Sequence, residues 1–175
     1  MNDWLAEPFR ALAAEYGAIE PQKDGLEGEG SGRRVVLREP MTLAGAVAKV
    51  KAHVQLERLR VAFAEGLLPS GPTPEGQQAA LDGTKVRTIL FQAGSGSGVL
   101  AGKGGDLWVT GEMGHHDVLA AAAAGSSIVL TEHTNTERGF LPRMGALVKE
   151  HLSATGVKGV PIHVSKIDAD PLRIV

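Results

Sequence analysis

The sequence predicts an α/β protein: a layered α/β/α domain built on a mixed, largely parallel sheet. From residue 86 onward, strand-like segments alternate with helix-like segments, which is the pattern of parallel strands joined by crossover helices. Residues 127–131 (SIVLT) are apolar in consecutive positions, and a strand of this kind needs cover on both faces. A chain of 175 residues is long enough to bury one hydrophobic core, so we expect a single domain over residues 1–175.

The first half of the chain predicts two helices and two short strands. We expect, in order, a helix from Asn2 to about Gly17, a loop over residues 20–33, a strand over residues 34–38, a helix after Thr42 that reaches Val54, and a strand over residues 58–63. Asn2 or Asp3 can cap the first helix and Thr42 the second, because their side chains accept the free N–H groups at a helix start. Residues 65–83 are rich in proline and glycine, which is typical of a mobile surface insertion.

The second half of the chain predicts alternating strands and helices. We expect a strand over residues 86–91 that ends in the turn AGSGSG, a strand over 107–110, a helix over 115–124, a strand over 127–131, a helix with Leu141, Met144, Val148 and Leu152 on one face, and a closing strand over 160–164. Gly125 can take the left-handed conformation that ends many helices. Pro142 fits only in the first turn of the last helix, so that helix begins close to it.

Charge and composition argue against several classes of protein. A net charge of −2 disfavours direct nucleic-acid binding, which draws its affinity from Lys and Arg on phosphates. No apolar run approaches the roughly 20 residues that cross a bilayer, and the first residues do not resemble a secretory signal. The chain has no cysteine, so any metal site must use His, Asp and Glu. We expect a soluble cytoplasmic protein without membrane association, with the nucleus as an alternative compartment.

Most residues that can perform chemistry lie in one stretch, GEMGHHDVLAAAAAGSSIVLTEHTNTERGF. His133 and Glu137 follow the strand at 127–131, and ligands of α/β proteins collect beyond the carboxyl ends of strands. An imidazole and a carboxylate four residues apart can converge on one cation where the chain turns. Such ligands suit Zn²⁺, Mn²⁺ or Fe²⁺, although a firm site needs three or four of them. The alternative is a surface loop in which Glu137 and Arg138 begin a helix.

Three polar residues precede this motif. His115 and His116 stand at a predicted helix start, where neighbouring side chains point about 100° apart. One of them can therefore line a cleft, but the two cannot easily share one metal ion. Glu112 lies just before the same helix and can either cap it or act as an acid or base.

The glycine-rich turn Gly94-Ser95-Gly96 is a further candidate. It follows a strand, and such a turn can offer backbone N–H groups to a phosphate or carboxylate. It lacks the Lys-Ser/Thr pair of a P-loop. A tight turn that packs against neighbouring backbone explains the same residues equally well.

Taken together, several motifs resemble a known family. The segments TGEMGHHD, EHTNTERGFL and VSKIDADPL, in this order, resemble the C-terminal half of the NGG-interacting-factor-three-like family, also called GTP cyclohydrolase I type 2 homologues. The segments LREPMTLAGAVAKVKAHV and AGSGSGVL resemble its eukaryotic branch. The resemblance covers nearly the whole chain and is weakest over residues 65–83. The combination of motifs is far more specific than any one of them.

The resemblance implies a fold of two similar halves, a two-metal centre in a cleft, and a homo-oligomeric ring, commonly a hexamer. His133 and Glu137 match metal ligands in the family's H-x-x-x-E-R motif, while His115 and His116 match a pair associated with the cleft. The family's other ligands, a His-His-Pro motif and a later Asp, have no counterpart in this sequence. The resemblance therefore implies an N-terminally truncated member that corresponds to about the C-terminal half of the fold.

Two functions from different classes are in keeping with this resemblance. The first is metal-dependent hydrolysis of a nucleotide-like substrate, in which Glu112 or His116 would move protons and Arg138 would offset phosphate charge. The second is a non-catalytic regulatory module that binds protein partners. The content of zinc, manganese or iron in the purified protein distinguishes the two. A fragment that self-associates through apolar surface is a third expectation.

Overall fold

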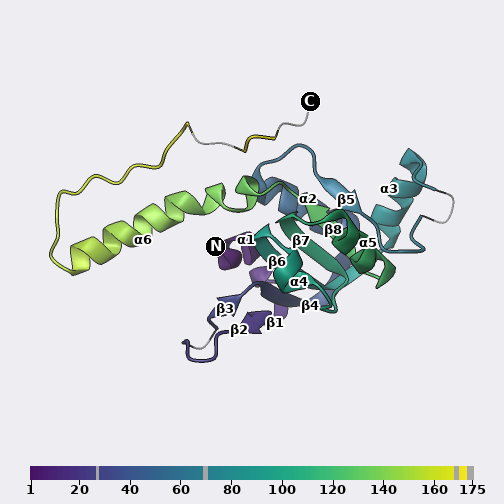
Figure 1. Ribbon diagram of the computed structural model, residues 1–175, viewed down its shortest axis with the longest axis horizontal. Coiled ribbons are helices and arrows are strands. Elements are labelled where there is room, and N and C mark those ends of the chain that lie inside the picture. The colour runs from purple at the N-terminus through teal and green to yellow at the C-terminus, as the bar shows by residue number, and fades with distance from the viewer. Residues whose placement is uncertain (27, 69–70, 168–169, 173–175) are drawn as a thin grey trace.

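The computed structural model describes residues 1–26, 28–68, 71–167 and 170–172 (Figure 1). Its helices are α1 (Asn2–Arg10), α2 (Leu43–Val54), α3 (Pro74–Gly83), α4 (Ser97–Leu100), α5 (His115–Ala123) and α6 (Leu141–Ala154), with two 3₁₀ turns, η1 (Thr134–Thr136) and η2 (Arg138–Phe140). Its strands are β1 (Ala13–Gly17), β2 (Glu20–Pro21), β3 (Gly30–Ser31), β4 (Arg33–Thr42), β5 (Arg60–Ala62), β6 (Lys85–Ser95), β7 (Leu107–Glu112) and β8 (Ser127–Leu130).

The main sheet has six described strands in the order β1-β4-β6-β7-β8-β5. The neighbouring strands β6, β7 and β8 are parallel, and Phe91, Val109 and Val129 lie side by side across them. The pairings β1–β4, β4–β6 and β5–β8 are antiparallel. The expected α/β fold on a mixed sheet is therefore confirmed, with its parallel part limited to the three strands of the second half.

Helices cover both faces of the sheet, as the apolar strand at 127–131 predicts. α1 and α2 pack on the face that holds Phe91 and Val109. α4 and α5 pack on the opposite face, against Leu90 and Trp108. Successive strand residues thus enter different cores, because strand side chains alternate between faces.

Local signals fix several helix boundaries as expected. The Thr42 side chain accepts a hydrogen bond from the Gly45 N–H at 3.1 Å and so caps α2. Gly125 follows α5 with a φ of 89°, which is the left-handed conformation that glycine adopts without strain. Pro142 lies in the first turn of α6, where no helical hydrogen bond is lost.

Four expectations differ from the structure. The first helix ends at Arg10, and residues 13–17 form β1 because they pair with β4 at the sheet edge. The expected loop over 20–33 contains the β2–β3 hairpin and the start of β4. Residues 160–164 form no strand. Within the insertion at 65–83, Thr73 caps helix α3, which packs against α2; residues 69 and 70 lie outside the described part.

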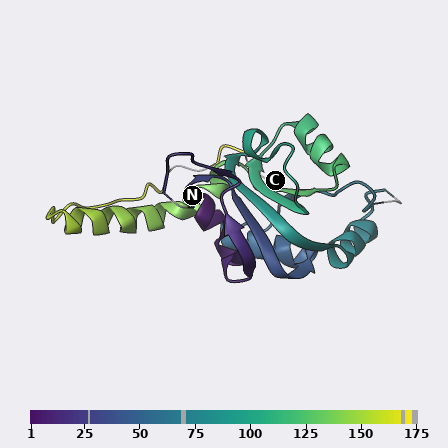
Figure 2. The ribbon, with the colours of Figure 1, turned by 90° about the horizontal axis from the view of Figure 1, so that it is seen from below.

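Helix α6 projects away from the sheet, and the segment after it runs back alongside (Figures 1 and 2). None of its described residues is buried, and Met144, Leu147 and Val148 are each between 43% and 51% exposed. Over the described part of the chain, no helix has the length and apolar character needed to cross a membrane.

Candidate functional site

The carboxyl ends of the three parallel strands bring the main sequence candidates together. Gly94 lies near the end of β6, Glu112 ends β7, and His133 follows β8. Parallel strands end at the same edge of a sheet, which is where α/β folds collect ligands. The turn η1 then carries the chain around, so that Glu137 returns to the side chain of His133.

His133 stands between two carboxylates. Its Nδ1 lies 2.9 Å from Oε1 of Glu112, and its Nε2 lies 3.6 Å from Oε1 of Glu137. The hydrogen bond to Glu112, more than the charges of both carboxylates, raises the pKa of His133 above its ordinary value. The ring is about half exposed, so solvent or a ligand can reach it.

A buried threonine sets the shape of the turn that carries this pair. The hydroxyl of Thr136 accepts the Gly94 N–H and donates to the His133 carbonyl, at 2.7 Å in each case. Thr136 is fully buried, and its hydrogen bond to Gly94 is shielded from water. Sequence analysis missed this residue, although its place in the i+3 position after His133 is the pattern of a side chain that closes a turn.

A second missed residue comes from the far end of the chain. The Asp170 carboxylate accepts hydrogen bonds from the Thr134 N–H and hydroxyl, and only 7% of the residue is exposed. Its negative charge also contributes to the raised pKa of His133. Asp170 lies in the segment VSKIDADPL, whose resemblance to the family was the one signal that could have pointed to it.

Side chains of neighbouring strands and turns pack closely against the glycine-rich turn. A Cβ on Gly94 would lie 3.0 Å from Nε2 of His133, and a Cβ on Gly96 would lie 2.6 Å from the Thr110 hydroxyl. The N–H of Gly94 donates to Thr136 and that of Gly96 to the Glu112 carbonyl, while Ser95 pairs with Glu112 in the sheet. Two donors that a phosphate would need are already used, which favours the tight-turn alternative over an anion cradle.

The other candidates are His115, His116 and Arg138. His115 and His116 are exposed in the first turn of α5, with ring centroids 5.8 Å apart. Arg138 donates to the Ser165 carbonyl at 2.9 Å.

The donor set of the described residues fits part of a metal site. Two ligands that bind one ion at 2.0–2.2 Å lie roughly 3–3.5 Å apart, close to the His133–Glu137 separation of 3.6 Å. Glu112 faces the other ring nitrogen, so it cannot share the same ion. Accordingly, no group of three or more His, Asp or Glu side chains among the described residues is arranged to hold a metal.

Comparison with known proteins gives a consistent answer. The family model DUF34/NIF3 (NGG1p interacting factor 3) matches residues 1–171. The chain is 39% identical over 166 residues to rat NIF3-like protein 1, covering 95% of this chain and 40% of the rat protein. It is 33% identical over 177 residues to the NIF3 homologue of Schizosaccharomyces pombe, covering 98% of this chain and 58% of that protein. The chain thus spans less than two thirds of the length of these relatives.

Solved structures agree with the sequence comparisons. A Bacillus cereus protein related to NIF3 is 28% identical with a TM-score of 0.65, over 86% of this chain and 37% of that one. A Staphylococcus aureus hypothetical protein is 17% identical with a TM-score of 0.71, over 99% of this chain and 63% of that one, and shows the same fold. The resemblance seen in the sequence motifs is confirmed: this chain belongs to the DUF34/NIF3 family.

Proposed function

We propose that this chain contributes a pair of ligands to a divalent-metal site, with Nε2 of His133 and Oε1 of Glu137 binding zinc, manganese or iron. One observation carries the proposal: these two atoms converge to 3.6 Å at the carboxyl edge of the parallel strands. An imidazole nitrogen and a carboxylate oxygen are ligands that all three metals accept.

Glu112 acts in this proposal as a positioning residue for His133. Its carboxylate accepts from the Nδ1 side of the ring, which leaves the Nε2 lone pair directed to the side of Glu137. Histidine ligands of metals commonly have a carboxylate partner of this kind, which fixes the tautomer and makes the ring a better donor. The hydrogen bonds of Thr136 hold the backbone beneath the pair.

A firm site needs ligands beyond this pair, because two ligands bind a metal weakly. They would come from a longer form of the protein or from a second chain, since the relatives are longer than this chain. In the complete protein we propose metal-dependent hydrolysis of a nucleotide-like substrate. His133 and Glu137 would help to hold the metal, which would supply a bound water with a pKa of about 7 as the nucleophile. His116 would exchange protons with the substrate, and Arg138 would lie near its negative charge.

Zinc titration of the purified chain, followed by native mass spectrometry, tests the ligand pair. We expect bound zinc that is lost in His133→Ala and in Glu137→Gln. His151→Ala, which removes an exposed histidine from α6, serves as the matched control and should bind zinc as the wild type does. Equal zinc content in wild type and His133→Ala would overturn the proposed ligands. Zinc bound by the wild type only in oligomers would show that a second chain completes the site.

A second candidate function, binding of another protein copy, is favoured by α6. Met144, Leu147 and Val148 expose apolar surface on a helix without a described core contact. Two α6 helices packed antiparallel about the middle of this patch would bring Arg143 of one copy opposite Glu150 of the other. Arg143 also lies 3.8 Å from Glu7 of its own chain, in an exposed ion pair that is weak and exchangeable. This charge complementarity suits a two-fold symmetric contact between identical chains. Such a contact closes a dimer by itself, so the ring that the resemblance implies would need a second interface between chains.

The number of subunits tests this contact. We expect Leu147→Glu to shift the chain to monomers in size-exclusion chromatography with light scattering. Leu119→Glu, at a leucine of α5 that is 53% exposed, is the control and should leave the oligomer intact. A chain that is monomeric at every concentration, or an oligomer insensitive to Leu147→Glu, would exclude this surface.

A further inference from the structure

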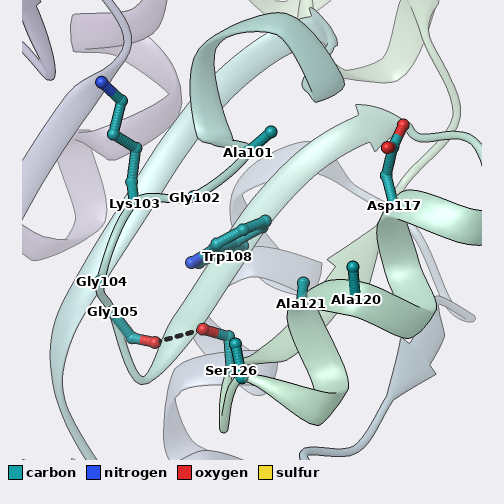
Figure 3. A pocket seen from close by; sticks show the side chains of 11 residues that line it. Ala101, Gly102, Lys103, Gly104, Gly105, Trp108, Asp117, Ala120, Ala121 and Ser126 are labelled. Carbon is teal, nitrogen blue, oxygen red and sulfur yellow. Dashed lines mark hydrogen bonds between the residues drawn. The ribbon is translucent and has the colours of Figure 1, made fainter.

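A cavity on the α5 face of the sheet lies away from the histidine pair. It has a volume of about 290 Å³ and is bounded by the loop 101–105, the side chain of Trp108 on β7, and helix α5 (Figure 3). Its floor is at the start of β7, whereas Glu112 ends β7 and His133 follows the carboxyl end of β8. The volume is near the lower end of the range for small-molecule sites.

The walls of this cavity are made of short side chains. Ala101 faces it from the loop, and Ala120 and Ala121 face it from α5 (Figure 3). The loop between Ala101 and Trp108 adds three glycines. Residues of this size leave room beside the indole that larger side chains would fill, so the space is a consequence of the sequence.

The indole N–H of Trp108 is an unused donor in the wall of this cavity, beneath the glycine-rich loop. Trp108 is only 3% exposed, and its Nε1 is the one fully buried side-chain polar atom without a hydrogen-bond partner among the residues that the structure describes. The nitrogen faces the loop, since a Cβ on Gly105 would lie 3.5 Å from it. A buried donor left unpaired destabilises the fold, and an acceptor atom of a ligand would recover this loss.

The other polar side chains of the cavity already have partners. The Ser126 hydroxyl donates to the Gly105 carbonyl at 2.7 Å, and Asp117 accepts from the Ser97 hydroxyl at 2.5 Å. Lys103 lies 3.4 Å from Glu20, but both side chains are more than 40% exposed, so this ion pair is weak and exchangeable. The cavity therefore has apolar walls, one cation at its rim, and one unpaired donor that the glycine-rich loop covers.

We propose that this cavity binds a small planar molecule that carries a carbonyl or carboxylate oxygen. The oxygen accepts the Trp108 N–H, and the flat apolar body lies among the alanines beside the indole, where aromatic rings pack favourably. If the oxygen belongs to a carboxylate, Lys103 exchanges Glu20 for the ligand. This proposal does not depend on the metal site.

The chain has two tryptophans, so ¹⁵N-labelled protein gives two indole N–H signals, with Trp4 as an internal control. Benzoate and benzamide are the probes. We expect each to move the Trp108 signal saturably, and the signal of Trp4 to stay in place. The indole signal that is missing in the Trp108→Phe variant is the one that belongs to Trp108. Ala120→Leu, which fills the cavity from an exposed helix position, should weaken binding at least about tenfold.

Ala123→Leu adds the same side chain at an exposed position of α5 outside the cavity and should bind both probes normally. Weaker binding of benzoate alone in Lys103→Ala would identify a carboxylate ligand, and unchanged binding of both probes would identify a carbonyl. Absence of a saturable shift, an equal shift of the Trp4 signal, or unchanged affinity in Ala120→Leu would each overturn the proposal.

Discussion

At the scale of single residues, the electrostatics of His133 depend on Glu112. The hydrogen bond from the ring to this carboxylate is the main reason that its pKa is raised. A raised histidine pKa stabilises the fold at pH values below the unfolded pKa, and this stability is lost as pH rises through the folded pKa. The effect on folding is small because the ring is half exposed, but the same protonation competes with metal binding at Nε2.

We therefore expect Glu112→Gln to lower the pKa of His133, because an amide oxygen stabilises the imidazolium less than a carboxylate does. The measurement is an NMR titration of the His133 ring protons. Glu132→Gln is the control, since Glu132 pairs with Arg60 at 2.6 Å rather than with the histidine. An unchanged pKa in Glu112→Gln would mean that the hydrogen bond does not form in solution.

A second charged cluster joins the first helix to the sheet. Arg33 is 8% exposed; it donates to both carboxylate oxygens of Asp3 at 2.7 Å, and Tyr16 donates to the same carboxylate. Burial raises the pKa of Asp3, but the hydrogen bonds from Arg33 and Tyr16 outweigh it and bring the pKa below its ordinary value. Burial and the hydrogen bond to Asp3 raise the pKa of Tyr16 to about 12.

Asp3→Asn should lower the free energy of unfolding by about 1–3 kcal/mol, because it removes the counter-charge of a buried arginine while Asp3 itself is partly exposed. Urea denaturation at pH 7 measures this loss. The contribution of Asp3 is complete above its unfolded pKa of about 4 and disappears as pH falls through the lower folded pKa. Glu15→Gln breaks the exposed pair with Arg34 and should change stability by less than about 0.5 kcal/mol. Equal losses in the two variants would contradict the assignment.

At the scale of elements, the sequence correctly predicts those helix and strand boundaries that depend on neighbouring residues. The cap at Thr42, the stop at Gly125 and the parallel strands of the second half follow from adjacent residues or short periodic patterns. The strand at residues 13–17 does not, because its pairing with β4 overrides an apolar pattern that also suits a helix. The site divides in the same way. The His133–Glu137 pair can be predicted because the two residues are four positions apart in the sequence. The contact of Asp170 with Thr134 cannot, because these residues are distant in the sequence and meet only in the folded protein.

Thr42→Ala should cost about 1 kcal/mol of stability, because the first turn of α2 loses its side-chain acceptor. Thr42→Ser keeps the hydroxyl and should retain most of the stability. Urea midpoints of the three proteins, with equal denaturant slopes, measure the difference. A serine variant as unstable as the alanine variant would assign the loss to the threonine methyl group instead of the cap.

At the scale of the whole molecule, helix α6 joins the core less firmly than the central strands do. The central strands β6 and β7 hold fully buried residues such as Ile89 and Val109, whereas α6 has no buried residue. Segments with few buried apolar contacts open at low free energy, so the projecting helix should be the least stable of the long helices.

Hydrogen exchange measured by mass spectrometry should therefore give faster exchange for α6 than for the sheet. In dilute protein, we expect peptides over residues 141–154 to exchange well before peptides over residues 86–91 and 107–110. The same helix is the proposed contact between copies, so its exchange should slow as protein concentration rises, while Leu147→Glu should abolish that dependence. Fast exchange at every concentration would mean that α6 stays exposed to solvent and forms no contact between copies. Slow exchange in dilute monomers would mean that it packs against its own chain.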